Sequence, residues 1–166
     1  MSLEEVRAKN IQLVSEKALD CFTKNGIANT KVADIAKAAG LTERSVYRYF
    51  EAKSDIVIAA AFCYWNRTKE HISRELSMHD YRDLSGIEQI SIILNSYANI
   101  LFIDPEGIRF SLDAETALYS AGKNERVINR PPERFEEHSG PLSVAIEKGL
   151  KDGTVDPKAD IRQLYY

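Results

Sequence analysis

The 166-residue sequence has few cysteines and histidines, the residues that most often cross-link a chain or bind a metal ion, and it has no long apolar run. Its two cysteines, Cys21 and Cys63, lie far apart in helical patterns, which predicts buried reduced thiols rather than a disulfide. The three histidines show no spacing typical of metal ligands. No apolar run approaches the roughly 20 residues that cross a bilayer, and no apolar segment follows a basic N-terminus. We therefore expect a cytoplasmic protein with no bound metal.

Strand patterns and common active-site patterns are also missing. No segment alternates polar and apolar residues, and the eight glycines lie mainly at the ends of predicted helices. No Ser-His-Asp, Cys-His or phosphate-cradling glycine pattern is present. The sequence thus predicts an all-α fold and argues against an enzyme or a cofactor protein. A helical enzyme or interaction module, in which the helical hairpin described below is only structural, stays as the weakest alternative.

Negative charge is concentrated in the C-terminal two thirds of the chain. The formal net charge is -3. Residues 1–55 hold nine basic and eight acidic residues, whereas residues 56–166 hold thirteen basic and seventeen acidic ones. The N-terminal part is therefore the part less repelled by a nucleic-acid backbone.

Residues 30–53 predict two short helices joined by a tight turn. Val32 and Ile35 recur at helical spacing, and Thr30 is placed to cap this first helix. Gly40 ends it, because a left-handed C′ position is cheapest for glycine. Thr42 follows as the N-cap of a second helix. This arrangement is typical of a helix-turn-helix.

The second helix, over about residues 43–49, exposes an unusual group of polar side chains. Val46 and Phe50 point inward, which leaves the arginines, tyrosines and Ser45 on or near the surface. Arginine can pair bidentately with guanine, while Ser, Tyr, Arg and Lys donate to phosphate oxygens. We predict double-stranded DNA as the partner. The candidate DNA contacts are Lys31, Thr42, Glu43, Arg44, Ser45, Tyr47, Arg48, Tyr49 and Lys53.

An ordered series of residues in the first third of the chain resembles the N-terminal domain of the tetracycline repressor (TetR) family of transcriptional regulators. Arg44, where the family often has Gly, and Ala52, where a capping residue is common, depart from its pattern. The resemblance implies that Tyr47 contacts the DNA backbone and that Lys53 touches a phosphate. The residues that carry it are Ala18, Phe22, Gly26, Thr30, Val32, Asp34, Ile35, Ala36, Ala39, Gly40, Leu41, Thr42, Tyr47, Arg48, Tyr49, Phe50 and Lys53.

Further helices are predicted on both sides of this motif, over residues 4–25, 53–78, 86–103 and 105–120, and from about residue 133 to 152 with a kink or break at Gly140 and Pro141. The first half of the long helix from Lys53 is apolar almost all round, which predicts burial. Ser85 and Glu88 have the spacing of a capping box, and Asp104 with Pro105 opens the next helix. Between them, one apolar stripe, widened by Ile92, Ile93 and Ile100, is expected to form the centre of a second core: Ile87, Ile90, Leu94, Tyr97 and Leu101.

We therefore expect a helix-turn-helix DNA-binding domain at residues 1–52 and a helical effector-binding and dimerisation domain at residues 53–166. The resemblance implies a homodimeric repressor, released from a palindromic operator by a small hydrophobic or aromatic effector. The long helix that starts at Lys53 would transmit effector binding. Candidate pocket residues are Phe62, Trp65, Tyr97, Phe110, Glu115, Tyr119, Phe135 and His138.

Two questions stay open at the level of sequence. The same fold could serve a DNA-binding factor that is controlled by a protein partner and has no small-molecule ligand. Dimers of the resembled family are usually built from two long C-terminal helices, but only thirteen residues follow Gly153. Either part of the C-terminus is absent from this sequence, or residues 133–166 form the dimer in another way.

Overall fold

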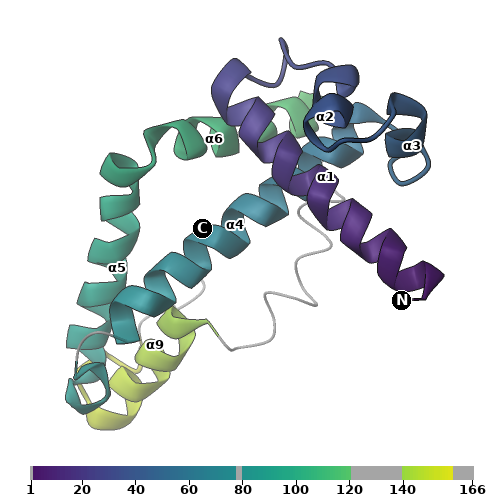
Figure 1. Ribbon diagram of the computed structural model, residues 1–166. Coiled ribbons are helices and arrows are strands. Elements are labelled where there is room, and N and C mark those ends of the chain that lie inside the picture. The colour runs from purple at the N-terminus through teal and green to yellow at the C-terminus, as the bar shows by residue number, and fades with distance from the viewer. Residues whose placement is uncertain (1, 78–79, 121–139, 159–166) are drawn as a thin grey trace. The chain divides into compact units, whose positions relative to one another are not determined.

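The computed structural model describes residues 2–77, 80–120 and 140–158, and every regular element in these ranges is a helix. This all-α architecture agrees with the prediction from sequence (Figure 1). The elements are α1 (Leu3–Asn25), α2 (Val32–Ala38), α3 (Glu43–Tyr47), α4 (Lys53–Ser77), a 3-10 turn (Tyr81–Asp83), α5 (Gly86–Ile103), α6 (Pro105–Ser120) and α9 (Pro141–Asp152).

The helices group into two compact units. The first unit comprises Met1–Thr68 and Ile103–Arg130, and the second comprises Lys69–Phe102 and Pro131–Tyr166. The first unit therefore contains α1, α2, α3 and α6 together with most of α4. Thus α6, which is remote in sequence from the helix-turn-helix, belongs to the same compact unit.

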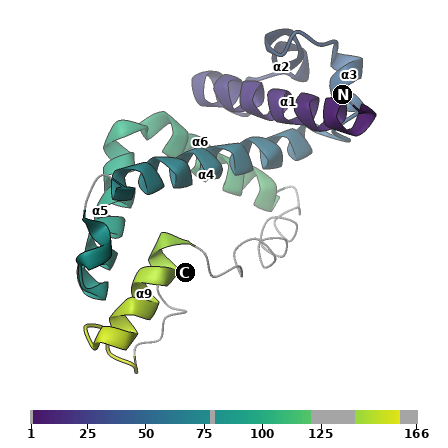
Figure 2. The ribbon, with the colours of Figure 1, turned by 60° about the horizontal axis from the view of Figure 1, so that its bottom comes forward.

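The core of the first unit is built around α1. Its stripe of Val14, Ala18 and Phe22 is buried, as the sequence pattern predicts. Figures 1 and 2 both show α2 and α3 beside α1, and α6 contacts α1 as well. The ring of Phe110 from α6 stacks on the ring of Phe22, with centroids 5.8 Å apart and planes 7° apart. Tyr64 of α4 meets Phe110 edge to face, at 6.4 Å.

Within α4, the N-terminal half is less completely buried than the sequence suggested. Ile56, Val57 and Ala60 are buried, but Ile58 and Phe62 are only partly so. The prediction of burial on almost all sides is therefore wrong. The reason is that α4 packs most tightly on the core through its buried residues, while Ile58 and Phe62 also line a surface depression.

The second unit buries one edge of the expected apolar stripe of α5 rather than its centre. Within the central stripe only Ile90 is buried, whereas Leu94 and Leu101 are 50% and 53% exposed. The buried face carries Ile93 and Ile100, which were expected to widen the stripe, together with Gln89 and Ser96. The centre of the predicted stripe is therefore corrected, and with it the rotation of α5 about its axis. Ile87 and Tyr97 of that stripe are exposed too.

Gln89 explains why α5 adopts this rotation. Its side-chain Nε2 donates hydrogen bonds to the carbonyl oxygens of Tyr81 and Leu84, at 2.8 Å and 3.0 Å. Apolar residues occur on nearly every side of α5, so burial alone selects no single face. A buried amide without partners is costly, and these two bonds satisfy both of its N–H donors with the Gln89 face turned inward.

The start of α5 lies against α9 at a contact between two glycines. The Gly86 N–H donates to Asp152 Oδ2 at 2.8 Å, and the Ile87 N–H donates to Thr154 Oγ1 at 3.1 Å. A hydrogen bond from the Thr154 hydroxyl, and the one from Gly86, lower the pKa of the Asp152 carboxyl. The N-terminus of α5 is thus capped by Asp152 and Thr154, which lie 66 and 67 positions further along the chain than the N–H groups they bind. The local contact between Ser85 and Glu88 adds to this cap.

By length and composition α5 is the one helix among the described residues that could cross a membrane, with a mean hydropathy of 1.2 over Gly86–Ile103. The expectation that no segment approaches this length is therefore corrected. A single helix that meets this criterion is weak evidence for a membrane span.

Candidate nucleic-acid interface

The turn between α2 and α3 has the geometry that its sequence predicts. Gly40 has a φ of +67°, a left-handed conformation that a side chain would strain. The Leu41 N–H then reaches back to the Ala36 carbonyl at 2.9 Å, which closes the end of α2. Thr42 caps α3, because its side-chain oxygen accepts the Ser45 N–H at 3.2 Å. These local bonds fix the angle at which α3 leaves α2.

Thr30 does not cap α2, contrary to the prediction. Lys31 is the N-cap residue, and Asp34 Oδ2 accepts the Lys31 N–H at 3.0 Å. The Thr30 side chain is buried instead, and its hydroxyl lies within 3.2 Å of the Cys21 carbonyl and 2.8 Å of the Gly26 carbonyl. Thr30 therefore ties the end of α1 to the start of α2.

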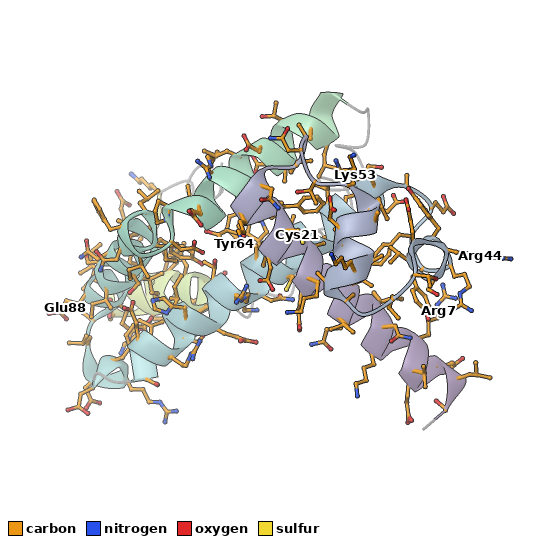
Figure 3. The ribbon with its side chains drawn as sticks, turned by 45° about the horizontal axis from the view of Figure 1, so that its top comes forward. Arg7, Cys21, Arg44, Lys53, Tyr64 and Glu88 are labelled. Carbon is orange, nitrogen blue, oxygen red and sulfur yellow. The ribbon has the colours of Figure 1, made fainter. Side chains whose placement is uncertain are left out.

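One side of helix α3 is anchored in the core of the first unit, and the other side is exposed to solvent. Val46 is fully buried and Phe50 is 7% exposed, and both belong to the core of the first unit. Figure 3 shows Arg44 extending away from the ribbon at this end of the unit. Of the predicted DNA contacts, Lys31, Thr42, Glu43, Arg44, Tyr47 and Arg48 are exposed, while Ser45, Tyr49 and Lys53 are partly buried.

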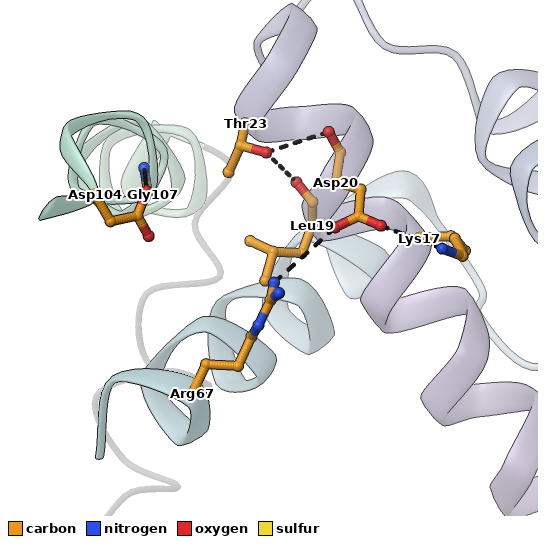
Figure 4. A network of polar contacts seen from close by, with 7 residues as sticks. All are labelled: Lys17, Leu19, Asp20, Thr23, Arg67, Asp104 and Gly107. Atoms are coloured by element: carbon orange, nitrogen blue, oxygen red, sulfur yellow. Dashed lines mark hydrogen bonds and ion pairs between the residues drawn. The ribbon is translucent and has the colours of Figure 1, made fainter. Parts of the chain in front are cut away.

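The arginines of this surface carry uncompensated charge. In the ranges that the structure covers, Asp20 pairs with both Lys17 and Arg67, as Figure 4 shows. The third pair in these ranges joins His71 and Glu75. Neither Arg44 nor Arg48 takes part in them. Arg48 donates one long hydrogen bond, to a neutral hydroxyl on the preceding turn at 3.4 Å. An exposed guanidinium without a carboxylate partner keeps most of its donors available for phosphate or base edges.

Lys53 has a structural contact that the sequence did not predict. Its ammonium donates to the carbonyl oxygen of Ile27, which lies in the loop between α1 and α2. Ala52 lacks a capping side chain, but its N–H donates to Asp55 Oδ2 at 2.9 Å and so is satisfied. Lys53 therefore holds the first residue of α4 against the loop that precedes the helix-turn-helix.

We expect Lys53→Met to lower the free energy of unfolding by about 2 kcal/mol, because a charged hydrogen bond is lost and a carbonyl is left unpaired. Urea unfolding followed by circular dichroism measures this change. Lys37→Met is the matched control, since Lys37 is exposed and should be replaceable within about 0.5 kcal/mol. Equal effects of the two substitutions would contradict the anchoring role.

The candidate effector residues do not gather around one cavity in the described parts of the chain. Phe110 belongs to the core, Trp65 is 43% exposed and Glu115 is exposed. Phe62 lines the shallow depression beside α4, whose other lining residues belong to the helix-turn-helix end of the chain or to α4 itself. Tyr97 lies in the second unit. The Tyr119 side chain, Phe135 and His138 fall outside the described residues.

Both cysteines are free thiols. Burial raises the pKa of the Cys21 thiol, and the negative charge of Asp20 raises it further. Cys21 is therefore protonated near neutral pH and is a poor nucleophile. Within the described residues, no group of three or more His, Cys, Asp or Glu side chains could hold a metal ion.

The helices α2 and α3 form a hairpin that is anchored in the core, and its short second helix exposes an arginine. This arrangement defines a DNA-binding protein of the helix-turn-helix class. Residues 15–60 match the family model described as "Bacterial regulatory proteins, tetR family". The N-terminal part of the chain is thus similar to the TetR family, in agreement with the resemblance seen in the sequence.

Several relatives support this assignment. The probable HTH-type transcriptional regulator ArpR of Pseudomonas putida is 34% identical over 83 residues, which cover 50% of this chain and 39% of that protein. The HTH-type transcriptional regulator TtgR, also of Pseudomonas putida, matches to the same extent. The chain thus spans about two fifths of the length of these relatives. The fatty acid metabolism regulator protein of Bacillus subtilis (strain 168) is 21% identical over 160 residues, covering 96% of this chain and 77% of that protein.

Solved structures share the fold. The transcriptional regulator FadR from Bacillus subtilis, in complex with stearoyl-CoA, aligns with a TM-score of 0.60 and 21% identity, covering 91% of this chain and 76% of that one. The TetR family regulator PfmR from Thermus thermophilus aligns with a TM-score of 0.52 and 20% identity, covering 89% and 75%. At this identity the likeness concerns the fold alone.

Proposed function

We propose that this protein is a cytoplasmic, non-enzymatic transcriptional regulator that binds a palindromic operator as a homodimer and represses transcription. The observation that carries the proposal is a pair of exposed arginines, Arg44 and Arg48, that have no carboxylate partner among the described residues. They lie at a second helix whose caps and buried anchors fix its direction. Such a helix enters the major groove, where Arg44 reads base edges and Arg48 contacts the backbone.

The division into a DNA-binding domain at residues 1–52 and a regulatory domain at residues 53–166 is part of this proposal. So are the nine predicted DNA contacts, with Lys53 assigned a second role as an anchor of the preceding loop. Twofold symmetry of the dimer would place two recognition helices on successive major grooves of the operator.

The effector is proposed to be a small hydrophobic molecule. Support comes from the match to the fatty acid metabolism regulator along nearly the whole of this chain, and from the fold shared with a regulator bound to stearoyl-CoA. An effector that binds only one arrangement of the helices would shift the population away from the DNA-competent one. Stearoyl-CoA is accordingly the first compound to titrate, and release of bound DNA is the expected result.

The test of DNA binding is fluorescence anisotropy with a fragment from upstream of the protein's own gene, measured across a salt series. We expect the binding constant to fall steeply as salt rises. Arg48→Ala should weaken binding by about 5- to 150-fold, because one phosphate or base contact is worth roughly 1–3 kcal/mol.

Arg109→Ala is the matched control, since Arg109 lies exposed on α6 and the substitution removes the same charge. It should leave binding unchanged. Weak binding that depends little on salt and is insensitive to Arg48→Ala would count against the regulator function.

A further inference from the structure

Tyr49 lies at the centre of a small group of side chains from two elements that are far apart in sequence. The guanidinium carbon of Arg7, on α1, is 6.0 Å from the centroid of the Tyr49 ring. That of Arg48, just after α3, is 5.9 Å from the same centroid. Asn10, one turn after Arg7 on α1, donates from Nδ2 to the Tyr49 hydroxyl at 2.9 Å. The side chain of Tyr49 is therefore held by α1, and both arginines lie against its ring.

The charge of this group is unbalanced. Like Arg48, Arg7 makes no ion pair within the described parts of the chain. Contact with the ring of a partly exposed tyrosine leaves both guanidiniums charged and most of their N–H donors free. An anion that binds beside the ring would balance this charge and use the free donors.

The location of the group identifies the kind of anion. Figure 3 shows Arg7 and Arg44 at the same end of the first unit, so Arg7 of α1 lies beside the surface that α3 presents. In a helix-turn-helix complex only the recognition helix enters the major groove, and elements beside it meet the sugar-phosphate backbone. The planar fork of arginine fits two oxygens of a phosphodiester.

We propose that Arg7 and Arg48, both held against Tyr49, form a phosphodiester-binding site at the edge of the recognition surface. Arg7 contacts the backbone directly, Tyr49 positions both arginines, and Asn10 fixes the orientation of Tyr49. This inference rests on the proposed function and extends the DNA interface to α1. The sequence does not show that Arg7 meets Tyr49, because the two residues stand 42 positions apart.

The test compares Arg7→Gln with Lys9→Gln in the anisotropy assay, with the same DNA and the same salt series. Both residues are exposed on α1, and two helical positions place them about 200° apart around the axis. Arg7→Gln should reduce the slope of log K against log salt by about 1, and should weaken specific and non-specific DNA by the same factor. Lys9→Gln should leave the slope unchanged.

The positioning role of Tyr49 is tested by a double-mutant cycle. Tyr49→Leu should weaken binding in the wild-type background and much less in the Arg7→Gln background, whereas independent effects would overturn this role. Tyr49→Phe keeps the ring and removes only the bond to Asn10, so it should have the smaller effect of the two.

The outcomes separate this inference from the function on which it rests. If the wild-type chain shows no salt-dependent DNA binding, the proposed function fails. If the wild type binds but Arg7→Gln keeps the full slope, or Lys9→Gln lowers it equally, the phosphodiester site is wrong and the regulator function stands.

Discussion

Phe110→Ala is expected to destabilise the protein by about 3–5 kcal/mol, the range typical of a buried phenylalanine truncated to alanine. The Phe110 side chain is 2% exposed, stacks on Phe22 of α1 and meets Tyr64 of α4 edge to face. Truncation therefore leaves a cavity bounded by three helices and removes two aromatic contacts. Denaturant unfolding should show the loss as a lower midpoint.

Leu112→Ala serves as the control for this substitution. Leu112 lies two positions further along α6 and is 60% exposed, so its truncation should change stability by no more than about 0.5 kcal/mol. A Phe110→Ala protein with near wild-type stability would mean that Phe110 faces a cavity, as the effector-pocket prediction required. The stacked geometry favours the core role.

Gly86→Ala is expected to destabilise the second unit by about 3 kcal/mol, a cost at the upper end of the usual range for overpacking. A Cβ atom on Gly86 would overlap the backbone N and Cα atoms of Gly149. Backbone atoms cannot rotate away as a side chain can, so the start of α5 must move from α9. That movement also stretches the bond from Gly86 N–H to Asp152.

Gly140→Ala provides the comparison within the same unit. It adds the same methyl group at a position where nothing lies within 4 Å, and Gly140 has an ordinary φ of -70°. Its midpoint of unfolding should stay close to that of the wild type. Similar midpoints for the two variants would show that the glycine contact does not limit how closely α5 and α9 approach.

Functional consequences are expected to differ between Phe110→Ala and Gly86→Ala. Phe110 packs on the helix that supports α2 and α3, so its loss should also reduce the fraction of chains competent for DNA binding. Measuring DNA affinity beside stability separates a general loss of fold from a specific loss of the interface.

The turn between α2 and α3 and the start of α6 were determined by sequence alone, because their caps are residues within about four positions. Gly40 adopts the left-handed conformation that its position predicts, and Thr42 caps α3. Asp104 likewise accepts the Gly107 N–H at 2.9 Å where α6 begins. The ordered pattern of the helix-turn-helix, and hence the family resemblance, could be read for the same reason.

The tertiary structure decided which faces are buried and which side chains meet. Gln89 finds its partners in the loop before α5 and turns that helix away from the predicted stripe. Lys53 binds a carbonyl 26 positions away, and Arg7 joins Arg48 at Tyr49. The Lys53 and Arg7 contacts join residues far apart in the chain, so they depend on packing that no local pattern encodes. The sequence alone determined the class of protein and its recognition helix, while the packing decided how far the DNA-binding surface extends.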